Sequence, residues 1–516
     1  MSTPAVSVTG NEAYGFVAEL IQFWARQTPH VGGYLQIAVD SHPDIAEGAF
    51  RVTANRGDSG TTAKVEGGTR SGVVYGVRSL FETLRNSPDS PSIELSCEPA
   101  LPYRLFWTWD HSTNWDLLSV GQQESGAFNG YEKQPEAFVD GYKRLVDFMS
   151  IHRITGVVVY GLLRDGHGGV EAAQEICRYA RDRGVRLIAG IAANAYGGIY
   201  YEGDHDYNLS TWLDRHPELE ASFDQMPGFH IDDYGRVPFP KGPLSRAALS
   251  DAPENLEWTI EGLAWLLETV EPGGINIEFG DYAGNDPIED MRVYLPAVIE
   301  TVRKHDPTLP VITDLGWDAL LDPELPGRLE GLPPECIYEF TFNKSYWDRL
   351  RSELTAEMVE RLPMPLRILR GQIGTQWNQQ RYSYMALDFA DMALLARRTG
   401  MDGISMFSEV SDFSPPNEFN YLAFARFGYE ADIDWDRFTQ ETLEPALGGP
   451  DAAWAYAEMA LALDSDPDEA TIEQFLPRAR EYSESADGDV RRRWIWLENE
   501  LMKRRHWRRV VANGAL

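Results

Sequence analysis

The sequence predicts an α/β fold in which a small α/β domain precedes a (β/α)8 barrel and a helical region follows it. The first observation is that eight short apolar segments alternate with amphipathic helical segments between residues 103 and 410. This alternation is typical of βαβ units that build a parallel sheet. The second is their number, because eight units over roughly 320 residues match a closed barrel with insertions better than an open sheet.

The length indicates more than one domain, since 516 residues exceed what one compact core normally holds. Strand-like runs at 33–69 and a helical segment at 71–86 predict a small sheet with a covering helix. The Pro- and Ser-rich segment 86–102 is typical of a linker. We therefore expect an N-terminal α/β domain, a barrel and a C-terminal helical region, at residues 1–98, 99–425 and 426–516.

The expected barrel strands are short apolar runs, most of them ending near a polar residue. They cover residues 103–109, 154–161, 185–194, 275–281, 310–317, 336–343, 366–373 and 402–410. The helical segments between them include residues 171–184, 253–270, 291–305 and 384–400. The longest insertion, residues 200–253, follows the third strand. Because loops after barrel strands lie on the active face, we expect it to form a wall of the pocket.

The strongly acidic composition excludes some classes of partner. The chain has 80 acidic and 46 basic residues, a formal net charge of -34, so nucleic acid and anionic membranes are not expected to bind. The N-terminal segment lacks the basic and apolar regions of a secretion signal, and no long apolar run follows, so we expect a cytoplasmic protein. The oligomeric state stays open, with a homodimer as one option.

Cysteine and histidine usage points away from metal and disulfide chemistry. Cys97, Cys177 and Cys336 lie far apart without a CxxC pair, so we expect three buried thiols. No HxH or HExxH spacing accompanies the histidines. We therefore expect neither a metal ion nor another cofactor.

The fourth predicted strand carries the most informative candidate for catalysis. Its residues Ile275, Ile277 and Phe279 alternate toward the helices, which directs Asn276 and Glu278 into the barrel interior. Glu278 then stands at the barrel mouth, where apolar neighbours raise the pKa of a carboxyl group, as a general acid requires. The alternative is a structural ion pair with an arginine of the barrel.

The partner of Glu278 has two candidates. Glycoside hydrolysis needs two carboxyl groups roughly 5 to 9.5 Å apart, or one acid and a substrate group that acts as the nucleophile. Glu339 on the sixth strand would supply the first arrangement, and Asp281 the second. The seventh strand contains no acid, which argues against a nucleophile there.

Polar and aromatic residues near the other strand ends suit the apolar face and the hydroxyl groups of a sugar ring. These candidate substrate-binding residues are Trp109, Asp110, His111, Asn194, Tyr196, Asp314, Trp317, Asn343, Trp377 and Glu409. For each tryptophan, a place in the hydrophobic core is an equally good interpretation.

Two segments carry a resemblance to known enzymes. VEGGTRSGVVYGVRSLFETL at 65–84 and PALPYRLFWTWDHS at 99–112 resemble the junction between the N-terminal domain and the barrel in exo-acting glycosidases. The similar families are the α-glucuronidases of glycoside hydrolase family 67 and the β-N-acetylhexosaminidases of families 20 and 84. The resemblance implies a hydrolase acting on a terminal sugar of an oligosaccharide or glycoconjugate, with its acid at Glu278 or Asp281.

The chain departs from these families in one position. Tyr282 stands where a second acid of the hexosaminidase pair is expected, so the α-glucuronidase-like pair of Glu278 and Glu339 transfers better. A catalytically silent carbohydrate-binding barrel and a sugar lyase or isomerase stay open as alternatives, because fold does not determine function.

Overall fold

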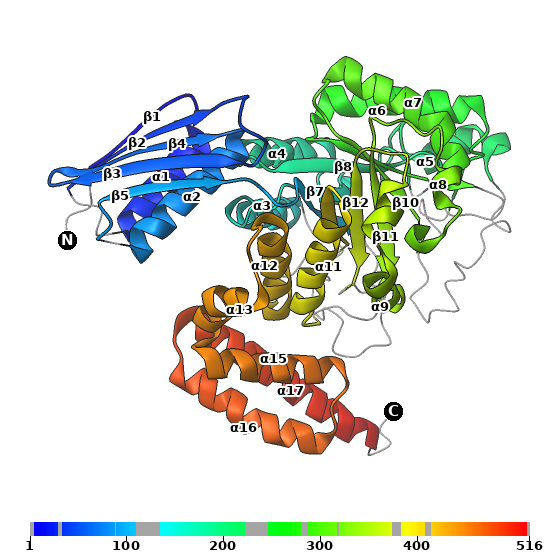
Figure 1. Cartoon of the computed structure of the whole chain (residues 1–516). Helices are drawn as coiled ribbons and strands as arrows, with labels where there is room; N and C mark the ends of the chain where they lie inside the picture. Colours follow the sequence, from blue (N-terminus) through cyan, green and yellow to red (C-terminus); the bar gives the residue numbers. More distant parts are fainter. Residues whose placement is uncertain are drawn as a thin grey trace.

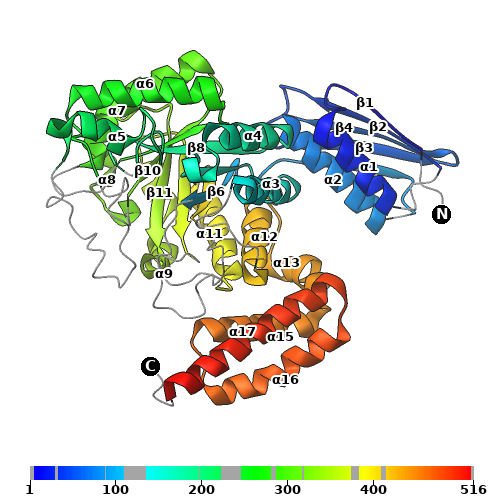
Figure 2. The same cartoon turned by 180° about the vertical axis from the view of Figure 1, so that it is seen from behind.

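The structure of the chain is a computed structural model. It has three parts: an N-terminal sheet with two helices, a closed parallel barrel and a group of C-terminal helices (Figures 1 and 2). The predicted fold class is confirmed. The structure describes residues 5–28, 33–87, 89–109, 135–195, 197–221, 246–279, 286–316, 319–373, 383–407 and 414–512.

The N-terminal sheet has the strand order β1-β2-β4-β3-β5. Its strands are β1 (Ala5–Thr9), β2 (Tyr34–Ser41), β3 (Phe50–Gly57), β4 (Gly60–Gly67) and β5 (Ser92–Cys97). Alternate residues of β2, β3 and β4 are buried, as expected for a sheet with one covered face. Helices α1 (Gly15–Gln27) and α2 (Arg70–Asn86) supply the apolar side chains that complete this core.

The segment predicted to be a linker contains a strand, so that prediction was wrong for its central residues. In β5, Ile93 lies opposite Ala54 and Leu95 lies opposite Val52 of β3, in antiparallel register. The alternation of apolar and polar residues in SIELSC is sufficient for an edge strand even between Pro-rich flanks. Cys97 at its end is partly exposed, which corrects the expectation that it is buried.

All eight predicted barrel strands form, and the last pairs with the first to close the barrel. They are β6 (Tyr103–Trp109), β7 (Gly156–Tyr160), β8 (Arg186–Ala192), β9 (Ile275–Glu278), β10 (Val311–Leu315), β11 (Ile337–Asn343), β12 (Arg367–Gln372) and β13 (Gly403–Phe407). Every neighbouring pair is parallel, as βαβ units require.

Helices surround the barrel, and the four predicted helical segments are among them. They are α3 (Pro135–Ile151), α4 (Gly169–Asp182), α5 (Leu209–Arg215), α6 (Pro253–Val270), α7 (Pro287–His305), α8 (Leu325–Arg328), α9 (Lys344–Glu353), α10 (Ala356–Glu360), α11 (Ala386–Thr399) and α12 (Pro415–Tyr429). The thiols of Cys177 in α4 and Cys336 before β11 are buried, as expected.

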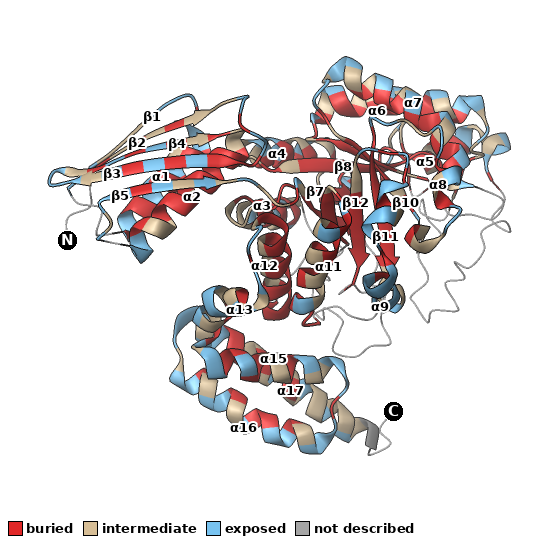
Figure 3. Ribbon diagram, in the orientation of Figure 1, coloured by how far each residue is buried: buried red, intermediate tan, exposed pale blue. Residues whose placement is uncertain are grey.

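The barrel interior changes from apolar to polar along the strands. Inward side chains form an apolar cluster that extends from the strand starts to Tyr160 at the end of β7. Its members are Leu105, Trp107, Val158, Tyr160, Ile188, Ile312, Ile337 and Ile368. The next inward positions toward the strand ends are polar or charged, and they include Asn276, Asp314, Glu339, Arg370 and Ser405. Figure 3 shows that the strands of the barrel are buried along most of their length. The polar layer is therefore inside the protein.

The C-terminal helices pack beside α11 and α12 (Figure 1). They are α13 (Trp435–Phe438), α14 (Glu444–Leu447), α15 (Pro450–Asp464), α16 (Glu469–Ser485) and α17 (Gly488–Ala512). The backbone N–H of Tyr384, between β12 and α11, donates to Asp464 over 3.1 Å. These helices thus contact the barrel on the side of its strand ends. Among the described residues, no helix has the length and apolar content needed to cross a membrane.

Tyr429, the last residue of α12, connects the barrel with the N-terminal domain. Its ring meets Tyr75 of α2 edge-on at a centroid distance of 5.6 Å, and its hydroxyl donates to the carbonyl oxygen of Gly48 over 3.0 Å. The guanidinium carbons of Arg104 and Arg153 lie 5.1 and 4.6 Å from the ring centroid. This one aromatic ring therefore combines apolar burial, a hydrogen bond and two cation–π contacts.

We expect Tyr429→Ala to lower the free energy of unfolding by roughly 3 to 5 kcal/mol, because a buried aromatic ring leaves a cavity. Tyr429→Phe keeps the ring and removes the hydroxyl that bonds Gly48, which should cost about 1 kcal/mol. Chemical denaturation measures both, with Tyr34→Ala at an exposed strand position as the control. Equal losses for Tyr429→Ala and the control would show that this contact does not stabilise the fold.

Candidate functional site

Four charged residues from four adjacent barrel strands meet inside the barrel. The Nη1 atom of Arg370 in β12 lies 3.2 Å from Asp314 Oδ2 in β10 and 3.8 Å from Glu339 Oε2 in β11. The same nitrogen lies 3.9 Å from Glu278 Oε1 at the end of β9. One guanidinium group thus joins three carboxylates, and we call these four residues the Arg370 cluster.

The alternation of each strand explains why these side chains point inward. In β9, Ile275 and Ile277 belong to the core outside the barrel, so Glu278 faces the interior. In β11, Tyr338 and Phe340 pack outward in the same way, which leaves Glu339 inside. The orientation that the strand pattern predicted for Glu278 agrees with the structure.

Aromatic and amide side chains form the floor beneath the charges. The guanidinium carbon of Arg370 lies 4.0 Å from the ring centroid of Trp107, and Tyr160 packs against that ring at 4.9 Å. The hydroxyl of Tyr160 donates to Asn276 Oδ1 over 2.7 Å. This bond directs Nδ2 of Asn276 to Glu339 Oε2, at 3.3 Å. The floor therefore fixes the orientation of one carboxylate.

Burial gives Glu339 an unusual proton affinity. Its side chain is 0% exposed, and this burial, aided by the charge of Asp314, raises its pKa to about 7. Arg370 and hydrogen bonds from Ser405 and Asn276 oppose the rise because they favour the charged form. Glu339 is therefore a carboxyl group that exchanges its proton near neutral pH.

The other two acids lie closer to the protein surface. The side chains of Glu278 and Asp314 are 15% and 13% exposed. Burial raises the pKa of Asp314, while Arg370 and the hydroxyl of Thr341 lower it. A substrate at the barrel mouth would meet these two carboxylates first.

The spacing of the acids is compatible with glycoside hydrolysis. Both Glu278 Oε1 and Glu339 Oε2 lie within 3.9 Å of Arg370 Nη1, so their separation is less than twice that distance. Glycosidases use carboxyl separations of roughly 5 to 9.5 Å.

In the part of the chain that the structure describes, no group of three His, Cys, Asp or Glu residues is arranged to hold a metal ion.

Comparison with known proteins identifies the fold at low sequence identity. No protein-family model and no curated protein matches the chain. Among solved structures, it is similar to a glycoside hydrolase family 138 enzyme targeting the pectin rhamnogalacturonan II. The TM-score is 0.61 and the identity 12%, over 98% of this chain and 68% of the other.

Two further similar structures are those of a β-N-acetylglucosaminidase and a β-hexosaminidase. A glycoside hydrolase family 20 β-N-acetylglucosaminidase has a TM-score of 0.52 and 12% identity, over 89% of this chain and 95% of the other. A mutant Streptomyces plicatus β-hexosaminidase in complex with its product GlcNAc has a TM-score of 0.50 and 14% identity, over 85% of this chain and 89% of the other. The chain has the fold of these glycoside hydrolases. The resemblance to family 20 is thereby confirmed for the fold.

Two predicted substrate-binding residues make other contacts. Asn194 after β8 is buried, and its Nδ2 donates to Asp290 of α7 over 3.2 Å. Asn343 caps α9, because its Oδ1 accepts the backbone N–H of Tyr346 over 3.1 Å. The structure thus connects both to helices beside the barrel, and a role in substrate binding stays a prediction for each.

The remaining predicted site residues are not described at the level of their side chains. Trp109 ends β6, but only its backbone is described. Outside the described residues lie Asp110, His111, Tyr196, Asp281, Trp317, Trp377 and Glu409. Their roles stay predictions.

Sequence reasoning did not include Arg370, Tyr160 or Ser405 among the site residues. A signal for the first was present, because Arg370 lies among apolar residues in LRILRGQI, and an arginine inside a strand is rarely buried without partners. Tyr160 ends a fully apolar strand, and Ser405 is small and polar at an inward position. For these two, only closure of the barrel reveals a contact with the acids.

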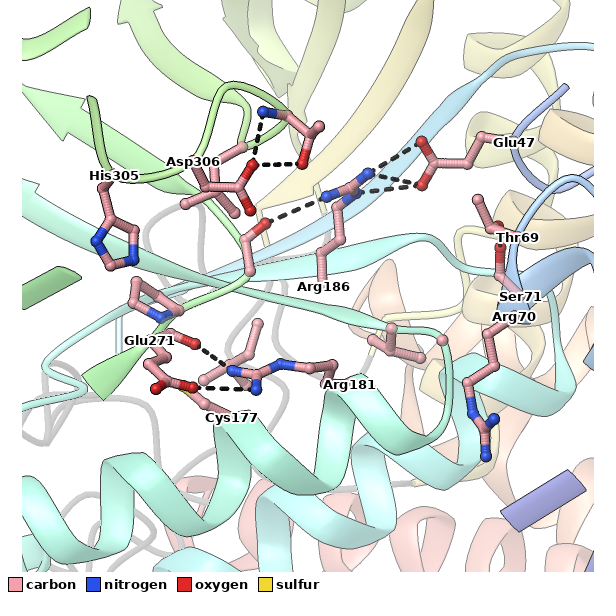
Figure 4. Close-up of a pocket in the computed structure, with 17 residues that line it drawn as sticks. Glu47, Thr69, Arg70, Ser71, Cys177, Arg181, Arg186, Glu271, His305 and Asp306 are labelled. Atoms are coloured by element: carbon pink, nitrogen blue, oxygen red, sulfur yellow. Dashed lines mark hydrogen bonds and ion pairs between the residues drawn. The ribbon is translucent and has the colours of Figure 1, made fainter. Parts of the chain in front are cut away.

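A cavity of about 480 Å³ lies at the other end of the barrel, beside the N-terminal domain (Figure 4). Its charges are paired, with Arg186 bonded to both carboxylate oxygens of Glu47 at 2.9 and 3.0 Å, and Arg181 to Glu271 at 3.1 Å. Barrel enzymes place their chemistry at the strand C-terminal ends. The candidate active site is therefore the Arg370 cluster.

The proton affinity of Glu339 predicts a pH-dependent stability. The pKa of Glu339 is higher in the folded chain than the ordinary 4.5. Its contribution to the free energy of unfolding is therefore full below pH 4.5 and is lost as the pH rises through about 7. Glu339→Gln does not titrate. We expect the free energy of unfolding of this variant, relative to that of the native chain, to increase by up to about 3 kcal/mol from about pH 4.5 to about pH 8.

Chemical denaturation at both pH values measures this difference. Glu300→Gln, on the exposed side of α7, is the matched control and should show no such trend. A stability difference between Glu339→Gln and the native chain that does not change with pH would contradict the raised pKa.

Proposed function

We propose that the chain is a glycoside hydrolase that removes a terminal sugar from an oligosaccharide or glycoconjugate by carboxylate catalysis. The observation that carries this proposal is the convergence of Glu278, Asp314 and Glu339 on Arg370 inside the barrel, with Glu278 at the C-terminal end of β9. The three similar structures, which are glycoside hydrolases, support a carbohydrate as the substrate.

In the proposed reaction, Glu278 is the proton donor. It lies at the end of β9 and is partly exposed, so its carboxyl group can reach the glycosidic oxygen of a sugar at the mouth. Protonation of that oxygen lets the bond to the anomeric carbon break, with positive charge developing on the sugar ring. The neighbouring carboxylate of Asp314 stabilises this charge electrostatically.

Glu339 is the proposed second carboxylate. In its ionised form it either attacks the anomeric carbon or removes a proton from the attacking water. Its pKa of about 7 means that the ionised fraction increases through neutral pH. We therefore expect kcat/KM to rise with pH through this range. Asp281 is the alternative partner, and it would act through a nucleophilic group of the substrate.

Glu278→Gln tests the proton donor. We expect kcat/KM to fall roughly 10²- to 10⁴-fold, the usual contribution of a general acid, while sugar binding stays saturable. A panel of aryl hexosaminides, uronides and neutral hexosides provides the substrates, and calorimetry with the cleaved sugar measures binding. Glu300→Gln is the control and should retain full activity.

Full activity of Glu278→Gln would exclude this residue as the acid. Saturable sugar binding by the native chain without turnover on any substrate would instead support the silent carbohydrate-binding barrel. The anomeric configuration of the first product, followed by NMR, distinguishes nucleophilic attack by Glu339 from activation of water.

A further inference from the structure

Arg370 is a charged residue buried inside the barrel. Its side chain is 3% exposed and lies between the apolar cluster of the barrel interior and the three acids. Burying a guanidinium group costs free energy unless opposite charges and hydrogen bonds compensate for the lost water. A barrel that only needed a filled interior could hold an apolar side chain at this place.

We propose that Arg370 is the positioning residue of the reaction, which holds the three acids of the cluster around one nitrogen atom and favours the ionised forms of Asp314 and Glu339. This inference rests on the proposed function and adds a residue that does not itself donate or accept the reacting proton. Two observations carry it, the distances from Nη1 to the three carboxylates and the contact of the guanidinium plane with Trp107.

Among the described residues, four charged or titratable groups on the surrounding strands interact with Arg370. They are Glu278 from β9, Asp314 from β10, Glu339 from β11 and the phenol of Tyr160 from β7. Burial raises the pKa of that phenol well above its usual value, so it stays neutral. When all three acids are ionised, one positive charge faces three negative ones. Removing the guanidinium would therefore leave three like charges together in a buried space.

The physical consequence is a change in proton affinity. Arg370 lowers the pKa of both Asp314 and Glu339, against the opposing effect of burial. Without it, both acids would hold their protons to higher pH, because like charges and low polarity disfavour ionisation. At neutral pH, Glu339 would then be protonated and unable to act as a base or nucleophile.

The geometry of the guanidinium group matters as well as its charge. A planar group stacks on Trp107 and directs its donors in fixed directions, whereas an ammonium group is compact and does neither. A lysine at this position would keep the charge but place the carboxylates less well. Charge and placement can therefore be separated by substitution.

The test compares Arg370→Met, Arg370→Gln and Arg370→Lys with the native chain. For the two uncharged variants, we expect the acidic limb of the kcat/KM profile to move up by about one pH unit or more. At pH 7 their kcat/KM should fall at least about fivefold and recover in part at higher pH. Arg370→Lys should keep the limb within about half a unit of the native position, with a lower kcat/KM.

Arg367→Met is the matched control, because Arg367 begins the same strand at the opposite end of the barrel and pairs with Asp402. It should change stability without moving the limb. If Arg370 only fills and stabilises the barrel, the uncharged variants lose stability while the limb keeps its native position. That result would overturn the proposal, and Arg370→Gln serves if Arg370→Met does not fold.

A second measurement does not depend on activity. Infrared titration of the carboxyl C=O stretch, taken as the difference between each chain and its Glu339→Gln counterpart, follows the proton on Glu339. An upward shift in Arg370→Met supports the positioning role even if no glycoside is hydrolysed, in which case the proposed function alone fails. An unchanged titration would overturn the role of Arg370.

Discussion

In a closed barrel, every second side chain of each strand shares one narrow interior, and all of these side chains must be mutually compatible. The chain meets this requirement with two layers. Ile312, Ile337 and Ile368 fill the layer near the strand starts, and Asp314, Glu339 and Arg370 lie two residues later in the same three strands. Two residues further along each of these strands, a charged layer therefore follows the hydrophobic one.

This arrangement couples the chemistry of the barrel to its stability. Burial raises the pKa of Glu339 to about 7, so ionising it at neutral pH opposes folding while preparing the group for catalysis. Arg370 limits that cost, and Trp107 beneath it supplies an aromatic surface that accepts a guanidinium plane. The site is thus destabilising by itself and depends on the surrounding packing.

The other two parts of the chain contribute such packing. The N-terminal domain is joined to the barrel through the buried ring of Tyr429, far from the strand ends. The C-terminal helices contact the opposite side, where Asp464 accepts the N–H of Tyr384 and its pKa rises to about 6, mainly through burial. Both contacts restrain segments that enter or leave the barrel without adding a group to the Arg370 cluster.

The sequence by itself determined the eight barrel strands, because apolar segments with inward polar residues at alternate positions require no long-range information. It also directed Glu278 inward. It did not reveal β5, whose short pattern was masked by Pro and Ser neighbours, nor the partly exposed Cys97. Only the tertiary structure decided that Arg370 of strand β12 meets acids from β9, β10 and β11, since register and closure set those neighbours.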